Sequence, residues 1–369
     1  MIRRFYVHNF RCLENFELPI ASTPTMLLIG GNGSGKSTVG FALEILQKIA
    51  RGENSVDKLV KSKDLSRGRA EVPMRLEIEV EFDGSLYEYT LAFELPAGFK
   101  ALRVRDENLK IDGKPIYSRQ FAEIHLHKSG SRPDATFGLD WHYVALPIIQ
   151  LHSSADKLSA FKQLIARSLI FRPVPVLISG ESNKELLEPD TFVSNFGDWF
   201  FGITRYAPAA YSQISKYLKQ VMPDFKEIKN QESGIESRSM FVEFSNETSV
   251  VSIPFNDLSD GEKCFMICSV VLAANEVYGP IICYWDEPDC YLAPHEVSHF
   301  VMALRQSFES KGQFITTSHS PEAIQRFSDD NTIVLHRRNH LEPTTVHLLA
   351  SLNRGGDLAG ALIRGEIVP

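Results

Sequence analysis

The sequence predicts an α/β fold with an antiparallel β subdomain and an inserted helical lobe, and three observations lead to this prediction. The apolar run Thr25–Ile29 is typical of a strand buried on both faces of a sheet, and a glycine-rich loop with a helical pattern follows it. Residues 76–82 and 87–95 alternate apolar and polar side chains with the period of half-buried strands. The pattern from about 150 to 225 is mainly helical, and strands alternate with helices again after 240.

Length and composition indicate a packed protein rather than a disordered or fibrous one. The 369 residues include 43% hydrophobic and 23% charged side chains, close to the averages for globular proteins. The net charge of -7 argues against an unaided, non-specific coat on nucleic acid. Five scattered cysteines exclude a disulfide framework, and no apolar run approaches the roughly 20 residues that span a bilayer. We therefore expect a cytoplasmic protein without a membrane segment.

The first half of the predicted core occupies residues 1–50. It contains a strand over 3–8, the buried strand 25–29 and a helix from Lys36 to Ile49. Residues 51–71 are charged and carry few large apolar side chains, which predicts an exposed connection.

The rest of the chain divides into three predicted regions. Turn residues at Asp83-Gly84 and Asp112-Gly113 predict two hairpins, so 51–150 is expected to be a linker and an antiparallel β subdomain. Helices over 158–169 and 206–222 make 151–239 a helical lobe. A strand pair, 240–244 and 250–253, opens the second half of the core, 240–369.

The segment Gly30-Gly-Asn-Gly-Ser-Gly-Lys-Ser37 matches the P-loop motif in the strand–helix context that the motif requires. Backbone N–H groups of such a loop surround phosphate oxygens, Lys36 reaches the β- and γ-phosphates, and Ser37 holds Mg²⁺. The predicted nucleotide-binding residues of the loop are Gly30, Asn32, Gly33, Ser34, Gly35, Lys36, Ser37 and Thr38.

Two further strand ends carry candidate catalytic side chains. The apolar strand 281–285 ends in Asp286 and Glu287. Asp286 is expected to hold Mg²⁺ together with Ser37, and Glu287 to orient and deprotonate the attacking water. The strand 313–317 ends just before His319, a candidate γ-phosphate sensor, because ligands collect at the carboxyl ends of parallel strands.

The segment Leu258-Ser-Asp-Gly-Glu-Lys263 precedes an apolar helix and offers a second anion site. The Ser259 hydroxyl and the Gly261 amide would lie at the helix N-terminus. Ser259 and Glu262 also have the spacing of a capping box. The two interpretations are compatible, since a capped helix start is also what binds phosphate.

Taken together, these segments resemble the Walker A, signature, Walker B and switch motifs of ABC-type ATPases, especially AAA-family ATPases of the RecF/SMC/OLD group. Asn9-Phe10-Arg11 before the P-loop and the Leu-Ser-Asp-Gly-Glu signature carry the resemblance to that group, over most of residues 1–50 and 240–335. The resemblance implies an ATPase head that uses ATP and Mg²⁺. It also implies two protomers facing head to tail, with Ser259 and Gly261 capping the γ-phosphate held by the other subunit's Lys36.

The sequence departs from the family pattern in three places. Leu292-Ala-Pro294 stands where many relatives have Leu-Asp, and the Q-loop glutamine has only two candidates, Gln150 and, next, Gln120. OLD-family nucleases carry a C-terminal Toprim domain, for which residues 320–369 are too few. A standalone ATPase head is therefore expected, with the effector chemistry on another chain.

The resemblance favours an ATPase that dimerises around Mg-ATP and drives or gates a DNA-repair or anti-phage defence system. The expected partners are a second copy of the chain, in a dimer or a higher oligomer, and a separate effector such as a nuclease or toxin, with DNA as an open alternative. Two other functions compete: the nucleotide-binding subunit of a transporter, and a regulatory switch with negligible turnover. The long insertion between Lys36 and Leu258 argues against the transporter.

Three other groups of residues are interpreted as structural. The segment His295-Glu-Val-Ser-His299 matches H-E-x-x-H, but no third zinc ligand is evident, so an exposed helix face is expected. Cys264 and Cys268 are expected to be core thiols. Solvated surface is the default for a set of cations that could otherwise form a basic patch: Arg3, Arg4, Arg11, Arg337, Arg338 and His340.

Overall fold

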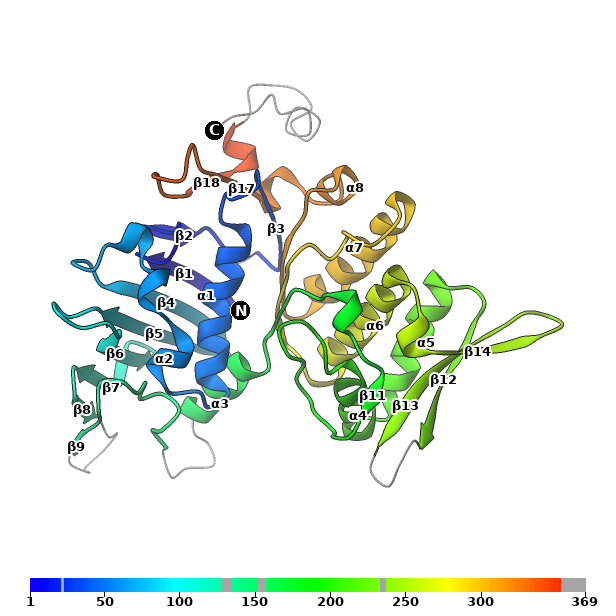
Figure 1. The fold of residues 1–369 in the computed structure, drawn as a ribbon, viewed down its shortest axis with the longest axis horizontal. Coiled ribbons are helices and arrows are strands. Elements are labelled where there is room, and N and C mark those ends of the chain that lie inside the picture. Colours follow the sequence, from blue (N-terminus) through cyan, green and yellow to red (C-terminus); the bar gives the residue numbers. More distant parts are fainter. Residues whose placement is uncertain (21–22, 128–134, 151–156, 233–236, 353–369) are drawn as a thin grey trace.

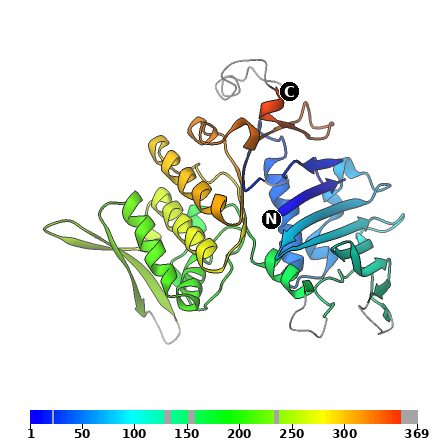
Figure 2. The same cartoon turned by 180° about the vertical axis from the view of Figure 1, so that it is seen from behind.

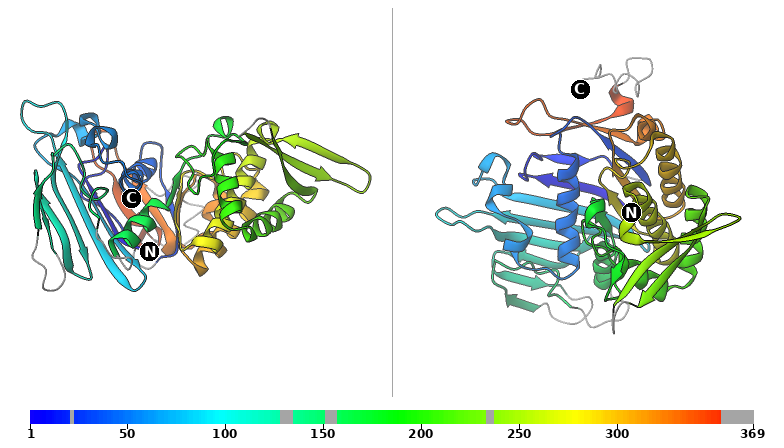
Figure 3. Two further views of the ribbon diagram at one scale, coloured as in Figure 1. Left: turned by 90° about the horizontal axis from the view of Figure 1, so that it is seen from below. Right: turned by 45° about the vertical axis from the view of Figure 1, so that its right-hand side comes forward.

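Three sheets organise the computed structural model, which describes residues 1–20, 23–127, 135–150, 157–232 and 237–352. An antiparallel sheet forms one side of the molecule and helices form the other, with strand β3 between them (Figures 1 and 2). Viewed from below, the cyan sheet and the yellow and green helices lie at opposite ends (Figure 3). Within the described ranges, no helix is long and apolar enough to cross a membrane.

The eight-stranded antiparallel sheet confirms the predicted hairpins. Asp83-Gly84 and Asp112-Gly113 are two-residue turns, and all four residues have positive φ, as type I′ turns require. The strands, in the order β2-β1-β4-β5-β6-β7-β8-β9, have the bounds Phe16–Leu18, Ile2–His8, Met74–Phe82, Ser85–Glu94, Arg103–Ile111, Lys114–Gln120, Glu123–Leu126 and Ala135–Gly138.

The six-stranded sheet carries the motifs, and its central strands are buried on both faces as predicted. On β3 (Thr25–Ile29), Met26 and Leu28 enter one hydrophobic core while Leu27 and Ile29 enter the other. Five strands are parallel and β18 is antiparallel. Besides β3, the strands in sheet order are β10 (Leu169–Phe171), β15 (Ile282–Trp285), β16 (Gln313–Thr317), and, beyond β3, β17 (Thr332–His336) and β18 (Thr345–Leu348).

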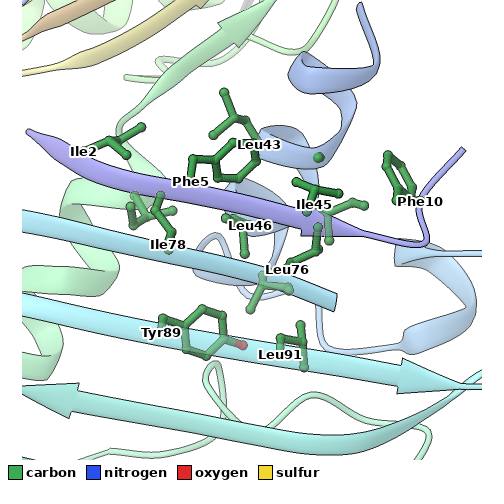
Figure 4. Close-up of a cluster of buried hydrophobic side chains, with 14 of the residues drawn as sticks. Ile2, Phe5, Phe10, Leu43, Ile45, Leu46, Leu76, Ile78, Tyr89 and Leu91 are labelled. Atoms are coloured by element: carbon green, nitrogen blue, oxygen red, sulfur yellow. The ribbon is translucent and has the colours of Figure 1, made fainter. Parts of the chain in front are cut away.

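The P-loop helix α1 (Lys36–Ala50) packs between the two larger sheets. Its side chains Leu43 and Leu46 meet Phe5, Leu76 and Leu91 of the antiparallel sheet in the first core (Figure 4). Replacing a fully buried leucine of this kind by alanine costs about 2–5 kcal/mol, so the antiparallel sheet is a structural support for the P-loop.

The second core lies between the other face of the parallel sheet and a layer of helices. These helices are α4 (Phe196–Tyr206), α5 (Ala209–Val221), α6 (Asp260–Tyr278) and α7 (Pro294–Ser310), and α8 (Pro321–Ile324) follows β16. A four-stranded sheet flanks them, built from β11 (Glu181–Ser182), β12 (Phe225–Glu232), β13 (Arg238–Ser245) and β14 (Val250–Pro254). Short 3₁₀ helices occupy Pro175–Leu177, Phe255–Asp257, Asp329–Asn331 and Leu349–Leu352.

Residues 51–71 differ from the exposed connection that their composition predicts. They contain α2 (Val56–Leu59) and two 3₁₀ turns, Ser62–Asp64 and Ser66–Gly68. Val56 and Leu65 are buried in the first core. The Asn9 side chain accepts from the Ser66 N–H and donates to the carbonyls of residues 69 and 72. The few apolar side chains are placed at turns, where a search for periodicity does not detect them.

The segment 151–239 is also divided differently from the single helical lobe that its pattern suggests. Helix α3 (Lys157–Ala166) packs against α1, and its Phe161 stacks on Tyr87 with ring centroids 5.4 Å apart. Strand β10 joins the parallel sheet, and β12 pairs with β13. Only α4 and α5 belong to the helical layer, because the apolar face of α3 is covered by the first core instead.

Candidate functional site

The P-loop adopts a conformation that only glycine permits at two of its positions. A Cβ atom on Gly30, which has φ 153°, would lie 2.1 Å from the carbonyl oxygen of Leu335 on β17. A Cβ on Gly35, with φ 104°, would lie 2.9 Å from both Cys12 Sγ and Thr344 Oγ1. Neighbouring segments therefore pack closely against the loop, and glycine at positions 30 and 35 is required by space as well as by backbone angle.

Lys36 begins α1 and is almost fully buried. Its Nζ donates to the Gly30 carbonyl at 2.8 Å, which closes the loop on itself. Burial lowers the pKa of Lys36, and the nearby Glu287 and Asp286 carboxylates oppose that shift without cancelling it. An anion entering the loop would add the favourable charge that this ammonium lacks.

A cavity of about 470 Å³ opens in front of the loop. The buried Ser34 Oγ has no hydrogen-bond partner within the described chain, so a bound oxygen could satisfy it. The cavity is lined by the loop and by side chains from three other segments: Arg11, Cys12, Asn32, Gly33, Ser34, Gly35, Lys36, Ser37, Thr38, Glu287, Arg337 and His340. Its size and its cationic lining suit a nucleotide phosphate chain.

The two carboxylates after β15 are fixed by the neighbouring strand β16. The Thr317 hydroxyl donates to Asp286 Oδ1 at 2.6 Å and accepts from the Glu287 N–H at 2.8 Å. The Asp286 N–H donates to the carbonyl of Phe171, the last residue of β10, at 3.0 Å. Parallel pairing on both sides thus positions the acidic strand end against the P-loop.

Ser37 and Asp286 line a second, much smaller cavity together with Arg172 and Glu44. One hydroxyl and one carboxylate on the same small cavity, of about 10 Å³, are oxygen ligands of the kind that Mg²⁺ uses beside a phosphate. The donor set therefore fits the ion that the P-loop motif implies.

His319 lies beside Glu287, as the strand order predicts. Its Nε2 is 3.5 Å from Glu287 Oε1, and the imidazole is about half exposed. The preceding Ser318 donates to Asp289 Oδ2 at 2.6 Å, which ties the segment after β16 to the segment after β15. Burial raises the pKa of Asp289, whose other oxygen has no partner in the described chain.

The signature segment lies elsewhere on the same molecule. Ser259 is the N-cap of α6: its hydroxyl accepts from the Glu262 N–H at 3.3 Å, and the Glu262 carboxylate accepts from the Ser259 N–H at 2.8 Å. The predicted capping box is confirmed. Ser259 is exposed, and neither Ser259 nor Gly261 lines the cavity at this chain's own P-loop.

Neither candidate Q-loop glutamine reaches the site. Gln120 ends β7 in the antiparallel sheet, Gln150 is exposed, and neither lines a cavity at the P-loop. The residue that follows β10, beside the acidic strand, is Arg172. Its guanidinium packs on the ring of Phe41 at 4.1 Å. Arg172 was not anticipated, and the three-residue apolar strand before Arg172-Pro173 is the signal that could have indicated it.

The H-E-x-x-H residues are confirmed as part of an exposed helix face. His295 and His299 are exposed on α7, and Glu296 caps the helix by accepting from the Ala293 N–H at 2.8 Å. Within the described chain, no group of three or more His, Cys, Asp or Glu side chains could hold a metal ion. Cys264 and Cys268 are buried core thiols, and burial raises the pKa of Cys264 to about 12.

The cations considered for a basic patch do not form one surface. Arg3 and Arg4 form ion pairs with glutamates of the antiparallel sheet, which neutralises them. Arg11 packs over the ring of Phe41 at 4.2 Å. Arg11, Arg337 and His340 all line the P-loop cavity. Three of the six cations thus line the candidate phosphate site, although Arg11 also forms an ion pair with Asp64.

Comparisons with known proteins agree with this geometry. Residues 26–325 match the family model described as "AAA domain, putative AbiEii toxin, Type IV TA system". An OLD nuclease of Thermus scotoductus is 41% identical over 46 residues, which is 12% of this chain and only 8% of the nuclease.

Two solved structures cover nearly the whole chain. An Smc head bound to the C-winged helix domain of ScpA matches with a TM-score of 0.58 and 13% identity, over 95% of this chain and 99% of that one. An Smc head with an extended coiled coil, bound to the C-terminal domain of ScpA and derived from Pyrococcus furiosus, gives 0.56 and 12%, over 95% and 97%. At these identities the likeness establishes the fold, that of an SMC head.

The family model spans well over half of the sequence, and the P-loop, the acidic strand and the switch histidine meet at one sheet edge. The chain therefore belongs to this AAA-domain family and has the fold of an SMC head, in agreement with its resemblance to the RecF/SMC/OLD group.

Proposed function

We propose that the chain binds and hydrolyses Mg-ATP in the cavity at its P-loop. The observation that carries the proposal is the convergence of Lys36, Glu287 and the P-loop amides around one cavity of about 470 Å³, with His319 beside Glu287. In this proposal the two halves of the core, 1–50 and 240–369, supply the phosphate-binding and the hydrolytic residues respectively.

Each side chain has a role that its position supports. Lys36 and the loop residues Gly30, Asn32, Gly33, Ser34, Gly35 and Thr38 hold the phosphates, and Ser37 with Asp286 holds Mg²⁺. When bound, the ion neutralises charge that develops on the phosphate oxygens. Glu287 accepts a proton from the attacking water and His319 donates a hydrogen bond to the γ-phosphate.

We also propose that two copies close head to tail around two nucleotides. Ser259 is exposed and Gly261 partly exposed at the start of α6, neither of them lines the cavity at this chain's own P-loop, and a helix N-terminus favours an anion. A second copy would bring its bound γ-phosphate to this helix start. The nucleotide would then be held between the subunits, and hydrolysis would reopen them.

A DNA-repair or anti-phage role with a separate effector, such as a nuclease or toxin, is proposed from the family alone. The match to a family described by a toxin of a toxin–antitoxin system supports it, as does the short similarity to an OLD nuclease. DNA contact has less support, because Arg3 and Arg4 are paired with glutamates, and Arg11, Arg337 and His340 line the phosphate cavity.

Phosphate release by the wild type and by Glu287→Gln tests the hydrolysis. We expect turnover in the wild type and a loss of at least 100-fold in the variant, with ATP binding retained. Lys36→Ala should lose ATP binding itself. Binding without release in the wild type would instead identify a regulatory switch, and absence of binding would contradict the whole proposal.

A further inference from the structure

The Glu287 carboxylate has a different neighbour on each of its two oxygens. His319 Nε2 lies 3.5 Å from Oε1, and the Cys290 thiol donates to Oε2 at 3.3 Å. Cys290 comes three residues after Glu287, in the tight segment that follows the acidic strand. The Cys290 N–H also donates to the Glu287 carbonyl at 3.4 Å, which closes this turn.

The backbone of Glu287 is well fixed, whereas its side chain is open to solvent. Glu287 has φ 49°, a left-handed conformation that non-glycine residues seldom adopt, and its N–H is held by Thr317. The side chain is 39% exposed, so core packing does not select its rotamer. The hydrogen bond from Cys290 to Oε2 and the contact between Oε1 and His319 are what remains to orient it.

Cys290 differs from the other four cysteines of the chain. Those four are buried, whereas Cys290 is exposed. The residue is exposed overall, but its thiol is partly shielded from water, and this partial burial, together with the hydrogen bond to Glu287, raises the pKa of the Cys290 thiol to about 12. The thiol therefore carries its proton at neutral pH and is available as a donor to the carboxylate.

We propose that Cys290 is a positioning residue for hydrolysis: its thiol donates to Glu287 Oε2 and holds the carboxylate in the orientation that leaves Oε1 facing His319 and the phosphate cavity. This inference rests on the proposed role of Glu287 as the general base. It assigns no contact between Cys290 and the nucleotide, and it requires no oxidation or modification of the thiol.

Cys290→Ala and Cys290→Ser test the effect on turnover. Loss of this single hydrogen bond from a thiol, a weak donor, to the carboxylate should lower kcat about three- to tenfold in the alanine variant, while KM changes less than twofold. Serine keeps a donor at the same position and should restore most of kcat. An unchanged kcat in Cys290→Ala, or equal defects in both variants, would overturn the proposal, and so would a defect confined to KM.

A second measurement needs no turnover and separates this inference from the proposed function. Iodoacetamide labelling of Cys290 in the nucleotide-free protein, followed by peptide mass spectrometry, reports how tightly the carboxylate holds the thiol proton. Glu287→Ala should speed labelling of Cys290 several-fold, and Glu247→Ala, which removes a remote exposed carboxylate, should not. Equal rates in Glu287→Ala and the wild type would overturn the contact. A wild type that labels as expected but releases no phosphate would count against the general-base role instead.

Discussion

Lys36, Asp286, Glu287 and His319 are separated by up to 283 positions in the chain, yet sequence reasoning could place them at one site. Each directly follows a strand or lies just beyond it, and parallel strands end at the same sheet edge. Contacts that depend on the exact pairing register of two strands could not be predicted in this way. The Thr317 bridge between the two carboxylates and the Cys290 contact arise from the pairing of β15 with β16 and from one left-handed residue.

Glu107 lies outside the candidate site and is the centre of a buried hydrogen-bond network. Its fully buried carboxylate accepts from the hydroxyls of Tyr89 and Tyr117 and from the N–H groups of Ala145 and Leu146, at 2.7–3.0 Å. Arg119, also buried, lies 3.6 Å away. This network fastens the segment after β9 to the antiparallel sheet.

Glu107→Leu should lower the free energy of unfolding by about 3–5 kcal/mol, because it leaves a buried guanidinium and two hydroxyls without their partner. Urea denaturation measures this. Glu81→Gln is the matched control, since Glu81 pairs with Arg3 at the surface of the same sheet and should cost less than about 0.5 kcal/mol. Equal losses in the two variants would contradict the assignment.

Glu77 gives a pH-dependent prediction. Burial raises its pKa, but hydrogen bonds from Arg4 and Arg75 outweigh burial, and the pKa lies below the ordinary 4.5. The stabilisation is therefore present above the unfolded-state pKa and is lost as pH falls through the lowered one. Glu77→Gln should cost about 0.5–1 kcal/mol at pH 7, after allowing for solvent screening, and progressively less as the pH falls below the ordinary pKa of 4.5. A difference that stays constant from pH 7 to pH 3 would refute this origin.

At the scale of elements, the strands that carry motifs were easier to predict than their surroundings. The run 25–29 and the run 281–285 are uniformly apolar, and both are buried on two faces. Residues 51–71 were expected to be exposed, yet they bury single side chains such as Val56. These buried side chains do not recur with a regular period, so the sequence pattern does not indicate their burial. Helix α3 was expected in the helical lobe but packs in the first core instead. An amphipathic pattern shows that one face of a helix is covered, but it does not show which element covers that face.

The contact between α1 and β15 makes a prediction about the P-loop helix. The Tyr284 hydroxyl donates to the Lys36 carbonyl at 2.7 Å, and a Cβ on Gly40 would lie 2.4 Å from the Tyr284 ring. Glycine at position 40 thus allows the acidic strand to approach the first turn of α1 closely. The P-loop and Asp286 depend on that approach.

Gly40→Ala should therefore destabilise the protein by about 1–3 kcal/mol and weaken ATP binding. Helix propensity alone predicts the opposite sign, since alanine is favoured over glycine by about 1 kcal/mol within a helix. Gly31→Ala is the control for stability, because its Cβ would have nothing within 4 Å. Thermal unfolding with and without ATP measures both effects, and a Gly40→Ala variant that gains stability would show that the strand can move away.

At the scale of the whole molecule, the two halves of the core were predicted, but the division of the chain among three sheets was not. Strands β1 and β2 precede the P-loop strand in the sequence, yet both belong to the antiparallel sheet, where β1 also pairs with β4. Non-local pairing of this kind depends on which apolar faces meet after folding, and strand patterns alone do not encode it. The separation of the signature from its own P-loop follows from that architecture and motivates the dimer proposal.

Exposed apolar residues beside the signature give that dimer its sharpest test. Val176 is 84% exposed and Leu177 50%, on the 3₁₀ turn whose Pro175 carbonyl accepts from Lys263 of α6 at 3.5 Å. If a second copy covers the start of α6, it should also cover this turn. Val176→Asp would then place a charge in an apolar contact, which costs several kcal/mol when unpaired.

In a Glu287→Gln background, which is expected to trap the ATP-bound state, light scattering should detect a dimer that Val176→Asp abolishes or weakens at least tenfold. ATP binding to the monomer should not change, because Val176 does not line the P-loop cavity. Val250→Asp is the matched control: Val250 is 54% exposed on β14, at the far edge of the helical side (Figure 1), and the dimer should survive its substitution. An ATP-dependent dimer that persists in Val176→Asp would mean that the copies meet through another surface. That result would also contradict the proposed contact of Ser259 and Gly261 with the nucleotide of the other subunit.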